Sequence, residues 1–198
     1  SFANYWMHNA FLNIDNKKMS KSLGNFRTVR DIAKNYDLQV LRFFMLSAHY
    51  RSPLNFSAEL MESSKNALER ILTAVDRLNE AIEHAQNRSL TAEEEENLTR
   101  AEQYVKNFDE AMDDDFNTAD AISAIFELVK LSNSTASSES ARAYLEKLKE
   151  MISSLCDILG IITQRKKEDL DAEVEKLIEM RQVARKEKNF ARADEIRD

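Results

Sequence analysis

The sequence contains one cysteine, one proline and two glycines among its 198 residues. The single cysteine, Cys156, excludes an internal disulfide framework and fits a reducing cytosol. Its apolar neighbours favour a packed core thiol over a reactive one. No run of about 18 apolar residues is present, and the first residues lack the basic start and apolar core of a signal peptide. We therefore expect a cytoplasmic protein that does not enter a membrane.

Recognised metal-binding patterns are also missing. His8, His49 and His84 lie far apart, without a cysteine or carboxylate at zinc-site spacing. The acidic run from Asp113 to Asp115 lacks the glycine and the distal glutamate of a calcium loop, so a loop or helix-start role is favoured there. The sequence therefore predicts no metal site in this chain.

Acidic residues are few at the N-terminal end. Residues 1–51 hold eight Lys or Arg and three Asp or Glu, whereas the remaining residues hold 20 against 32, within a net charge of −7. The basic end would attract phosphates. The acidic remainder would have to face away from an RNA or present only local basic patches.

One stretch combines positive charge, hydroxyls and turn residues, namely Lys18-Met19-Ser20-Lys21-Ser22. Residues Phe11 to Ile14 alternate like a short strand, Asp15-Asn16 turns the chain and Gly24 leads out, so both lysines are expected on a loop rather than on a helix face. A lysine is a compact charge with three donors that suits phosphate oxygens, while hydroxyls and loop amides add hydrogen bonds. The stretch is therefore a candidate polyphosphate-binding loop. Taken alone, such a short loop is more often solvated surface.

Most of the chain carries helical signals. Residues 2–9 are expected to be the end of a helix. Thr28–Asp31 resembles a capping box that opens a second helix, and Asp37 is expected to start a third. The second and third helices are expected to brace the loop. After Pro53 almost nothing reads as strand, and apolar residues recur at helical spacing in four stretches. These are Leu68, Ile71, Leu72, Val75, Leu78 and Ile82; Leu98, Ala101, Val105, Phe108 and Met112; Ile122, Ile125, Phe126 and Val129; and Ala141, Leu145, Leu148, Ile152, Leu155 and Leu159. Four helices with short polar connections predict an antiparallel bundle.

Helix ends are marked as well. Thr91–Glu94 is expected to cap the second of these helices, and Glu93–Glu96 lie where carboxylates favour the helix dipole. The third helix is expected to open near Asn117. Residues Ser132 to Ser140 read as a polar linker, and Gly160 is expected to end the fourth helix.

The C-terminal stretch is basic again. Charges alternate from Gln164 onward, and Arg181–Arg197 holds six Lys or Arg against three acidic residues. Phe190 stands among these cations, an arrangement in which the ring can stack a splayed base while Arg185 and its neighbours hold phosphates. Packing of Phe190 between two short helices is an alternative of at least equal weight.

The loop and its surroundings resemble a known family. Trp6-Met7-His8-Asn9, the strand, the Lys18–Ser22 motif and Leu23-Gly24-Asn25-Phe26 together resemble the signature loop of class I aminoacyl-tRNA synthetases. Leu41–Ser57 and Met112–Ala119 look like segments of cysteinyl-tRNA synthetases in particular, and Ala184–Asp198 is similar to that family's C-terminal region. The resemblance spans nearly the whole chain.

This resemblance implies a function and its site. Members of the family activate cysteine with ATP and Mg²⁺ and transfer it to the 3′ end of tRNA(Cys). Lys21 would be the main catalytic contact to the ATP phosphates and Lys18 would assist it, within an ATP-binding loop of Lys18, Met19, Ser20, Lys21 and Ser22. Contacts to tRNA are expected from Arg42, Arg51, Arg185 and Phe190, with an ordinary surface role an equal alternative for Arg42 and Arg51. The family's Zn²⁺ binds the cysteine thiolate through ligands that precede this region, and a monomer is expected.

The resemblance also divides the chain. Residues 1–56 would be the end of the catalytic domain with the KMSKS loop and connecting helices. Residues 57–163 would be a tRNA-binding, DALR-like helical bundle, and residues 164–198 the start of an anticodon-binding module. The expected fold is mainly α, with a short strand beside the loop. Because the sequence lacks an initiator methionine and starts and stops within helical patterns, we expect a fragment that is inactive alone.

Two alternatives stay open. A synthetase-like ligase that couples cysteine to an amino-sugar inositol resembles the same family, but it binds no tRNA and has no need of the basic C-terminal stretch. A helical RNA-binding or scaffold protein that retains only a remnant of the loop is the second alternative. Restoring the upstream sequence would separate all three, since a HIGH-type motif and a zinc set would support an enzyme.

Overall fold

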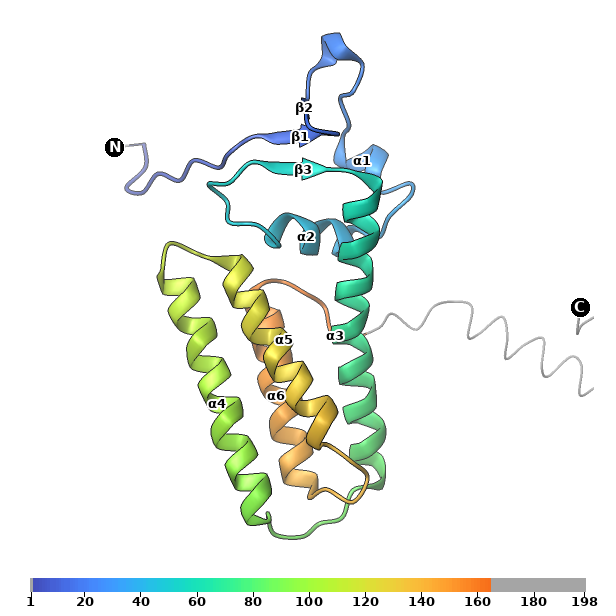
Figure 1. The fold of residues 1–198 in the computed structure, drawn as a ribbon, viewed down its shortest axis with the longest axis vertical. Coiled ribbons are helices and arrows are strands. Elements are labelled where there is room, and N and C mark those ends of the chain that lie inside the picture. The colour runs from blue at the N-terminus through green and yellow to red at the C-terminus, as the bar shows by residue number, and fades with distance from the viewer. Residues whose placement is uncertain (1, 165–198) are drawn as a thin grey trace, which may run out of the picture. The chain divides into compact units, whose positions relative to one another are not determined.

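The fold is known from a computed structural model that describes residues 2–164, and Ser1–Thr163 form one compact unit (Figure 1). The predictions for Arg185, Phe190 and the anticodon-binding module fall outside the described residues. Within the described part, six helices and a small sheet confirm the expected mainly α fold.

The sheet has three short strands in the order β2-β1-β3. Strand β1 (Leu12–Ile14) pairs antiparallel with β2 (Lys17–Lys18) and parallel with β3 (Leu54–Phe56). Asp15 and Asn16 join β1 to β2 with φ angles of 47° and 60°. Two consecutive left-handed residues make the tight hairpin turn that matches strand twist, and Asp and Asn tolerate this conformation. The predicted strand and turn are confirmed.

Two short helices follow the hairpin and precede β3. Helix α1 (Val29–Ile32) begins with the predicted capping box, in which Thr28 and Asp31 each accept from the other's backbone N–H. Helix α2 (Leu38–Leu46) begins at Asp37, whose carboxylate accepts from Gln39 N. The rings of Phe44 on α2 and Phe56 on β3 meet edge to face with centroids 5.7 Å apart. Helix α2 therefore supports the sheet that carries the hairpin.

The rest of the described chain is a four-helix bundle. It comprises α3 (Ala58–His84), α4 (Ala92–Asp113), α5 (Thr118–Thr135) and α6 (Arg142–Ile158), and successive helices run antiparallel (Figure 1). The predicted stripes provide much of the core, with Ile71, Leu78, Ile125, Leu148 and Ile152 fully buried. Thr91 and Asn117 cap α4 and α5 as predicted, and Gly160 follows α6 with φ 65°. Cys156 is buried in this core, where desolvation raises the pKa of its thiol to about 12.

The bundle is tied together at its sheet-distal end by Glu94, in the first turn of α4. This buried carboxylate accepts from both guanidinium nitrogens of Arg88, from Thr91 N and from Ala141 N, at 2.8 to 2.9 Å. Arg88 also donates to Glu139 O. One side chain thus joins the α3–α4 connection to the α5–α6 connection.

Three expectations were wrong in detail. Residues 2–9 form no helix, and Phe2, Tyr5 and Trp6 are exposed, so no packing stabilises a helix this short. Helix α5 continues to Thr135, with the Ser134 and Thr135 hydroxyls donating to Leu131 O, so the polar linker begins only at Ala136. A short strand, β3, does follow Pro53. It forms by pairing with β1, which lies about 40 residues earlier in the chain, so the local sequence does not indicate it.

Within residues 2–164, no helix has the length and apolarity that a membrane crossing requires.

Candidate functional site

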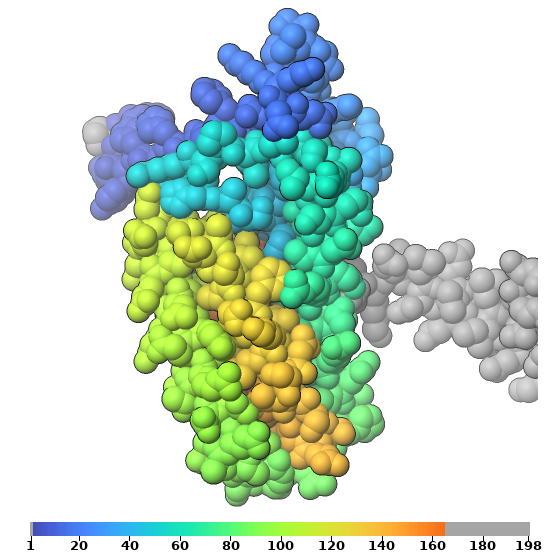
Figure 2. All heavy atoms as spheres, viewed as in Figure 1, coloured from blue at the N-terminus to red at the C-terminus, as the bar shows by residue number. Residues whose placement is uncertain are grey.

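The candidate site is the loop that projects from the β1–β2 hairpin, at one end of the molecule in Figure 2. The hairpin turn is anchored to β3, since Asp15 N donates to Phe56 O at 3.1 Å and Asn16 N donates to the Asn55 side-chain oxygen at 2.7 Å. The loop is therefore rooted in the sheet, whose third strand leads directly into α3.

The five motif residues occupy three kinds of backbone. Lys18 is the last residue of β2, Ser20 is extended with φ −155° and ψ 143°, and Lys21 begins a 3₁₀ turn (Lys21–Leu23). Gly24 closes the turn with φ 66°, donating its N–H to Lys21 O at 3.2 Å. A left-handed residue is required there, which explains a glycine at this position. The lysines thus lie on a strand end and a tight turn, and neither lies on an α-helix.

Asn25 bridges the two limbs of this loop. Its side-chain oxygen accepts from Ser20 N at 2.9 Å, and its amide nitrogen donates to Lys18 O at 3.1 Å. Asn25 entered the sequence-based prediction only as part of the family resemblance, with no role of its own. The available signal was its chemistry, since an amide beside a left-handed glycine supplies both a donor and an acceptor to a nearby strand end.

The functional groups of the loop face solvent. Lys18, Lys21 and Ser22 are exposed, and the Ser20 and Ser22 hydroxyl oxygens lie 2.7 Å apart. The Lys21 ammonium lies 5.5 Å from the centroid of the Phe26 ring. Among the described residues, no carboxylate forms an ion pair with Lys18 or Lys21. Two ammonium groups and two hydroxyls within five residues are thus available to an anion.

The predicted tRNA contacts lie elsewhere on the fold. Arg42 is exposed on α2, and its guanidinium packs against Gly160, where a Cβ would come within 3.0 Å of Nη1. Arg51 lies just before β3 and pairs with Asp115, with Nε 3.0 Å from Oδ2. The structure therefore brings Lys18–Ser22 together and places Arg42 beside Gly160 and Arg51 beside Asp115.

Asp115 is the centre of a polar cluster at the α4–α5 corner. The Tyr50 hydroxyl donates to its Oδ1 at 2.7 Å, Arg51 Nη2 donates to the same oxygen at 3.3 Å, and His49 Nε2 lies 3.7 Å from Oδ2. Asp115 has φ 60°, a conformation that aspartate tolerates. The cluster joins the segment before β3 to the bundle.

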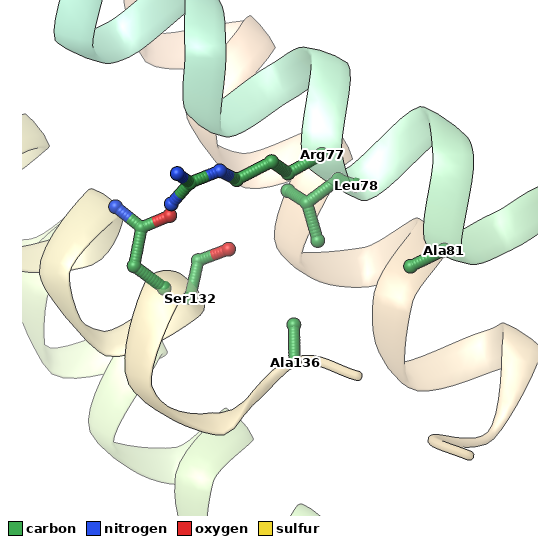
Figure 3. Close-up of a pocket in the computed structure, with 6 residues that line it drawn as sticks. Arg77, Leu78, Ala81, Ser132 and Ala136 are labelled. Carbon is green, nitrogen blue, oxygen red and sulfur yellow. The ribbon is translucent and has the colours of Figure 1, made fainter. Parts of the chain in front are cut away.

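Within residues 2–164, neither a metal-binding group nor the pocket between α3 and α5 offers a site that competes with the loop. No set of three or more His, Cys, Asp or Glu within residues 2–164 is arranged to hold a metal ion. A small pocket between α3 and α5 has a volume of about 60 Å³ and is lined by Arg77, Leu78, Ala81, Ser132, Asn133 and Ala136 (Figure 3). Ligand pockets are typically about 300 Å³ or larger, so this one does not fit a nucleotide.

Comparison with known proteins finds two family models that match parts of the chain. Residues 1–66 match the family described as the tRNA synthetases class I (C) catalytic domain, and residues 107–164 match the DALR domain. The whole chain is 63% identical to part of a cysteine–tRNA ligase of Lachnospira eligens, of which it covers 42%. It is 55% identical to part of a cysteine–tRNA ligase of Lachnoclostridium phytofermentans, of which it covers 43%. The chain thus spans less than half the length of these relatives.

Proposed function

We propose that this chain, which is homologous over its whole length to one region of the cysteine–tRNA ligases, serves in such a ligase as the ATP-phosphate loop and the helical support for tRNA. The complete ligase would activate cysteine with ATP and transfer it to tRNA(Cys). The observation that carries the proposal is the loop itself, with two ammonium groups that no described carboxylate neutralises.

The loop residues would act on the phosphates. When the cysteine carboxylate attacks the α-phosphorus, negative charge builds on the phosphoryl oxygens and on the departing pyrophosphate. Lys21 would stabilise that charge, and Lys18 would add a second cation at the strand end. The Ser20 and Ser22 hydroxyls, now bonded to each other, would turn to donate to phosphate oxygens. A lysine contributes most if its contact is stronger in the transition state than in bound ATP.

Metal ions would come from outside the described residues. Mg²⁺ would accompany ATP and neutralise its phosphates, and Zn²⁺ would hold the cysteine thiolate in the remainder of the ligase. Within residues 2–164 no three or more His, Cys, Asp or Glu are arranged to hold a metal ion, and the steps assigned to this chain use its lysines and hydroxyls.

The remaining residues would serve the tRNA. We assign residues 1–56 to the end of the catalytic domain, residues 57–163 to a tRNA-binding bundle and residues 164–198 to the start of the anticodon-binding module. Arg42, Arg51, Arg185 and Phe190 are the proposed RNA contacts. Arg51 would exchange its pairing with Asp115 for a phosphate or hold both at once. The chain alone would be inactive, and the ligase would work as a cytoplasmic monomer.

The proposal is tested in a complete cysteine–tRNA ligase that contains this chain. ATP–pyrophosphate exchange should fall strongly in Lys21→Ala. The matched control is Lys65→Ala, which removes an exposed lysine of α3 that pairs with Glu62, and exchange should stay normal. Equal ATP–pyrophosphate exchange rates in both variants would show that Lys21 takes no part in cysteine activation.

A further inference from the structure

We propose that Asn25 is the positioning residue of the KMSKS loop. Its side-chain amide would take the place of a neighbouring strand, hold residues 18–20 extended and so fix where Lys21 leaves the hairpin. This role rests on the proposed function of the loop, whereas the contacts behind it belong to the fold.

The two hydrogen bonds of Asn25 have the pattern of a strand pair. In an extended chain, the carbonyl of one residue and the N–H of the residue two positions later point to the same side. Asn25 uses this pair, donating to Lys18 O at 3.1 Å and accepting from Ser20 N at 2.9 Å. Ser20 has extended backbone angles, and Lys18 is the last residue of β2. The side chain thus bonds to residues 18 and 20 as a neighbouring strand would.

Only an amide of this length matches both partners. Ser20 N can only donate and Lys18 O can only accept, so the orientation of the Asn25 amide is fixed by its neighbours. An aspartate would accept from Ser20 but would place a negative oxygen against the Lys18 carbonyl. Glutamine would carry the amide one methylene too far for the same backbone geometry.

The remaining restraints on the loop are weak. The 3₁₀ turn from Lys21 to Leu23 contains no buried residue, so hydrophobic packing does not hold it. The Ser20–Ser22 hydroxyl contact and the Lys21–Phe26 contact are exposed interactions of side chains that rotate freely. Asn25, which is half-buried, therefore carries much of the order of this segment.

The bridge also decides which groups a polyphosphate meets. Ser20 N is already bonded to Asn25, so the loop presents its lysine ammonium groups and serine hydroxyls to the anion. Moving Asn25 would release the Ser20 N–H and let residues 18–21 rotate. The two lysines would still be present, but their ammonium groups would occupy a wider range of positions before ATP binds.

The first test measures the bridge in this chain. Amide hydrogen exchange of Ser20, followed by NMR, should become about tenfold faster or more in Asn25→Ala, which removes the acceptor of the Ser20 N–H. Asn25→Asp keeps an acceptor for this N–H and should leave Ser20 better protected than Asn25→Ala does. Asn107→Ala, on α4, is the matched asparagine control and should leave Ser20 unchanged. Unchanged Ser20 exchange in Asn25→Ala would overturn the bridge. The helical melting transition should stay intact, because Asn25 lies outside the bundle core.

The second test measures, in the complete ligase, whether the Asn25 bridge affects cysteine activation. Asn25→Asp and Asn25→Ala should lower the rate of adenylate formation about tenfold or more, with the KM for cysteine unchanged. A drop for Lys21→Ala with normal rates for both Asn25 variants would overturn the positioning role alone. Normal rates for Lys21→Ala would instead defeat the proposed function, so the two failures are distinguishable.

Discussion

Glu94 accepts two hydrogen bonds from the Arg88 guanidinium, each 2.8 Å long, and this pair joins two connections of the bundle that are about 50 residues apart. The carboxylate is buried and has four donors in all. Replacing it leaves a guanidinium and two backbone N–H groups without their acceptor, a far larger loss than removing an exposed charge.

We therefore predict that Glu94→Ala lowers the free energy of unfolding by about 2 to 4 kcal/mol, measured by urea denaturation. Glu102→Ala, an exposed glutamate of the same helix, should change it by less than about 0.5 kcal/mol. Equal effects in the two variants would mean that the Glu94 contacts contribute little to stability.

Glu94 also predicts a pH dependence. Its hydrogen bonds from Arg88, Thr91 N and Ala141 N outweigh the opposing effect of burial and lower its pKa from 4.5 to about 2. The folded state therefore favours the ionised form, so this stabilisation is full above about pH 4.5 and is lost as the pH falls toward 2. The stability gap between the unmodified chain and Glu94→Gln should be constant near neutral pH and narrow across that window. A gap that does not change from pH 5 to pH 2 would contradict the assignment.

Much of the fold could be predicted because helix caps and helical stripes are local. Thr28, Asp37, Thr91 and Asn117 each cap the helix expected of them, since capping needs only residues within one turn. The parallel pairing of β1 with β3 could not be predicted, because it joins short segments about 40 residues apart. Strand β1 was predicted from its alternation and the turn that follows it, whereas the short segments β2 and β3 show too little alternation to be recognised.

The charged residues of the candidate site were predicted from the sequence, whereas the residues that support them were not. Lys18 to Ser22 could be recognised by their charges and hydroxyls. Asn25 acts through two hydrogen bonds to the backbone, which no sequence periodicity indicates. Glu94 was predicted only as part of the Thr91–Glu94 cap, and its burial and its pairing with Arg88 were not. Only the approach of Arg88 and Ala141 in the folded chain selects Glu94 as the buried carboxylate of this turn.

The Asp115 cluster yields a stability prediction. In Tyr50→Phe the Asp115 carboxylate loses the hydroxyl donor at 2.7 Å, and Arg51 Nε loses an acceptor at 3.0 Å. We expect a loss of about 1 kcal/mol in the free energy of unfolding. Tyr5→Phe, a tyrosine whose side chain is fully open to solvent, should leave stability unchanged. A loss in Tyr5→Phe as large as in Tyr50→Phe would show that the cluster has no special contribution.

The proposed RNA contacts are tested by separating the two half-reactions in the complete ligase. Arg185→Ala and Phe190→Ala should weaken tRNA aminoacylation and leave ATP–pyrophosphate exchange nearly unchanged. Stacking of one base contributes roughly 1 to 3 kcal/mol, so Phe190→Ala should raise the tRNA concentration required about tenfold or more. Equal losses in both assays, or a melting temperature that falls in step with activity, would favour the packing role of Phe190.

The central claim is that Lys21 stabilises charge on the ATP phosphates during cysteine activation. The most direct measurement is the pre-steady-state rate of cysteinyl-adenylate formation by the complete ligase, recorded beside equilibrium binding of cysteine. Lys21→Ala should slow adenylate formation by about 100- to 1000-fold and leave cysteine binding almost unchanged, because the lysine acts on phosphates whose charge grows during attack. A Lys21→Ala enzyme that forms the adenylate at the normal rate would contradict the claim and return the motif to a solvated lysine loop.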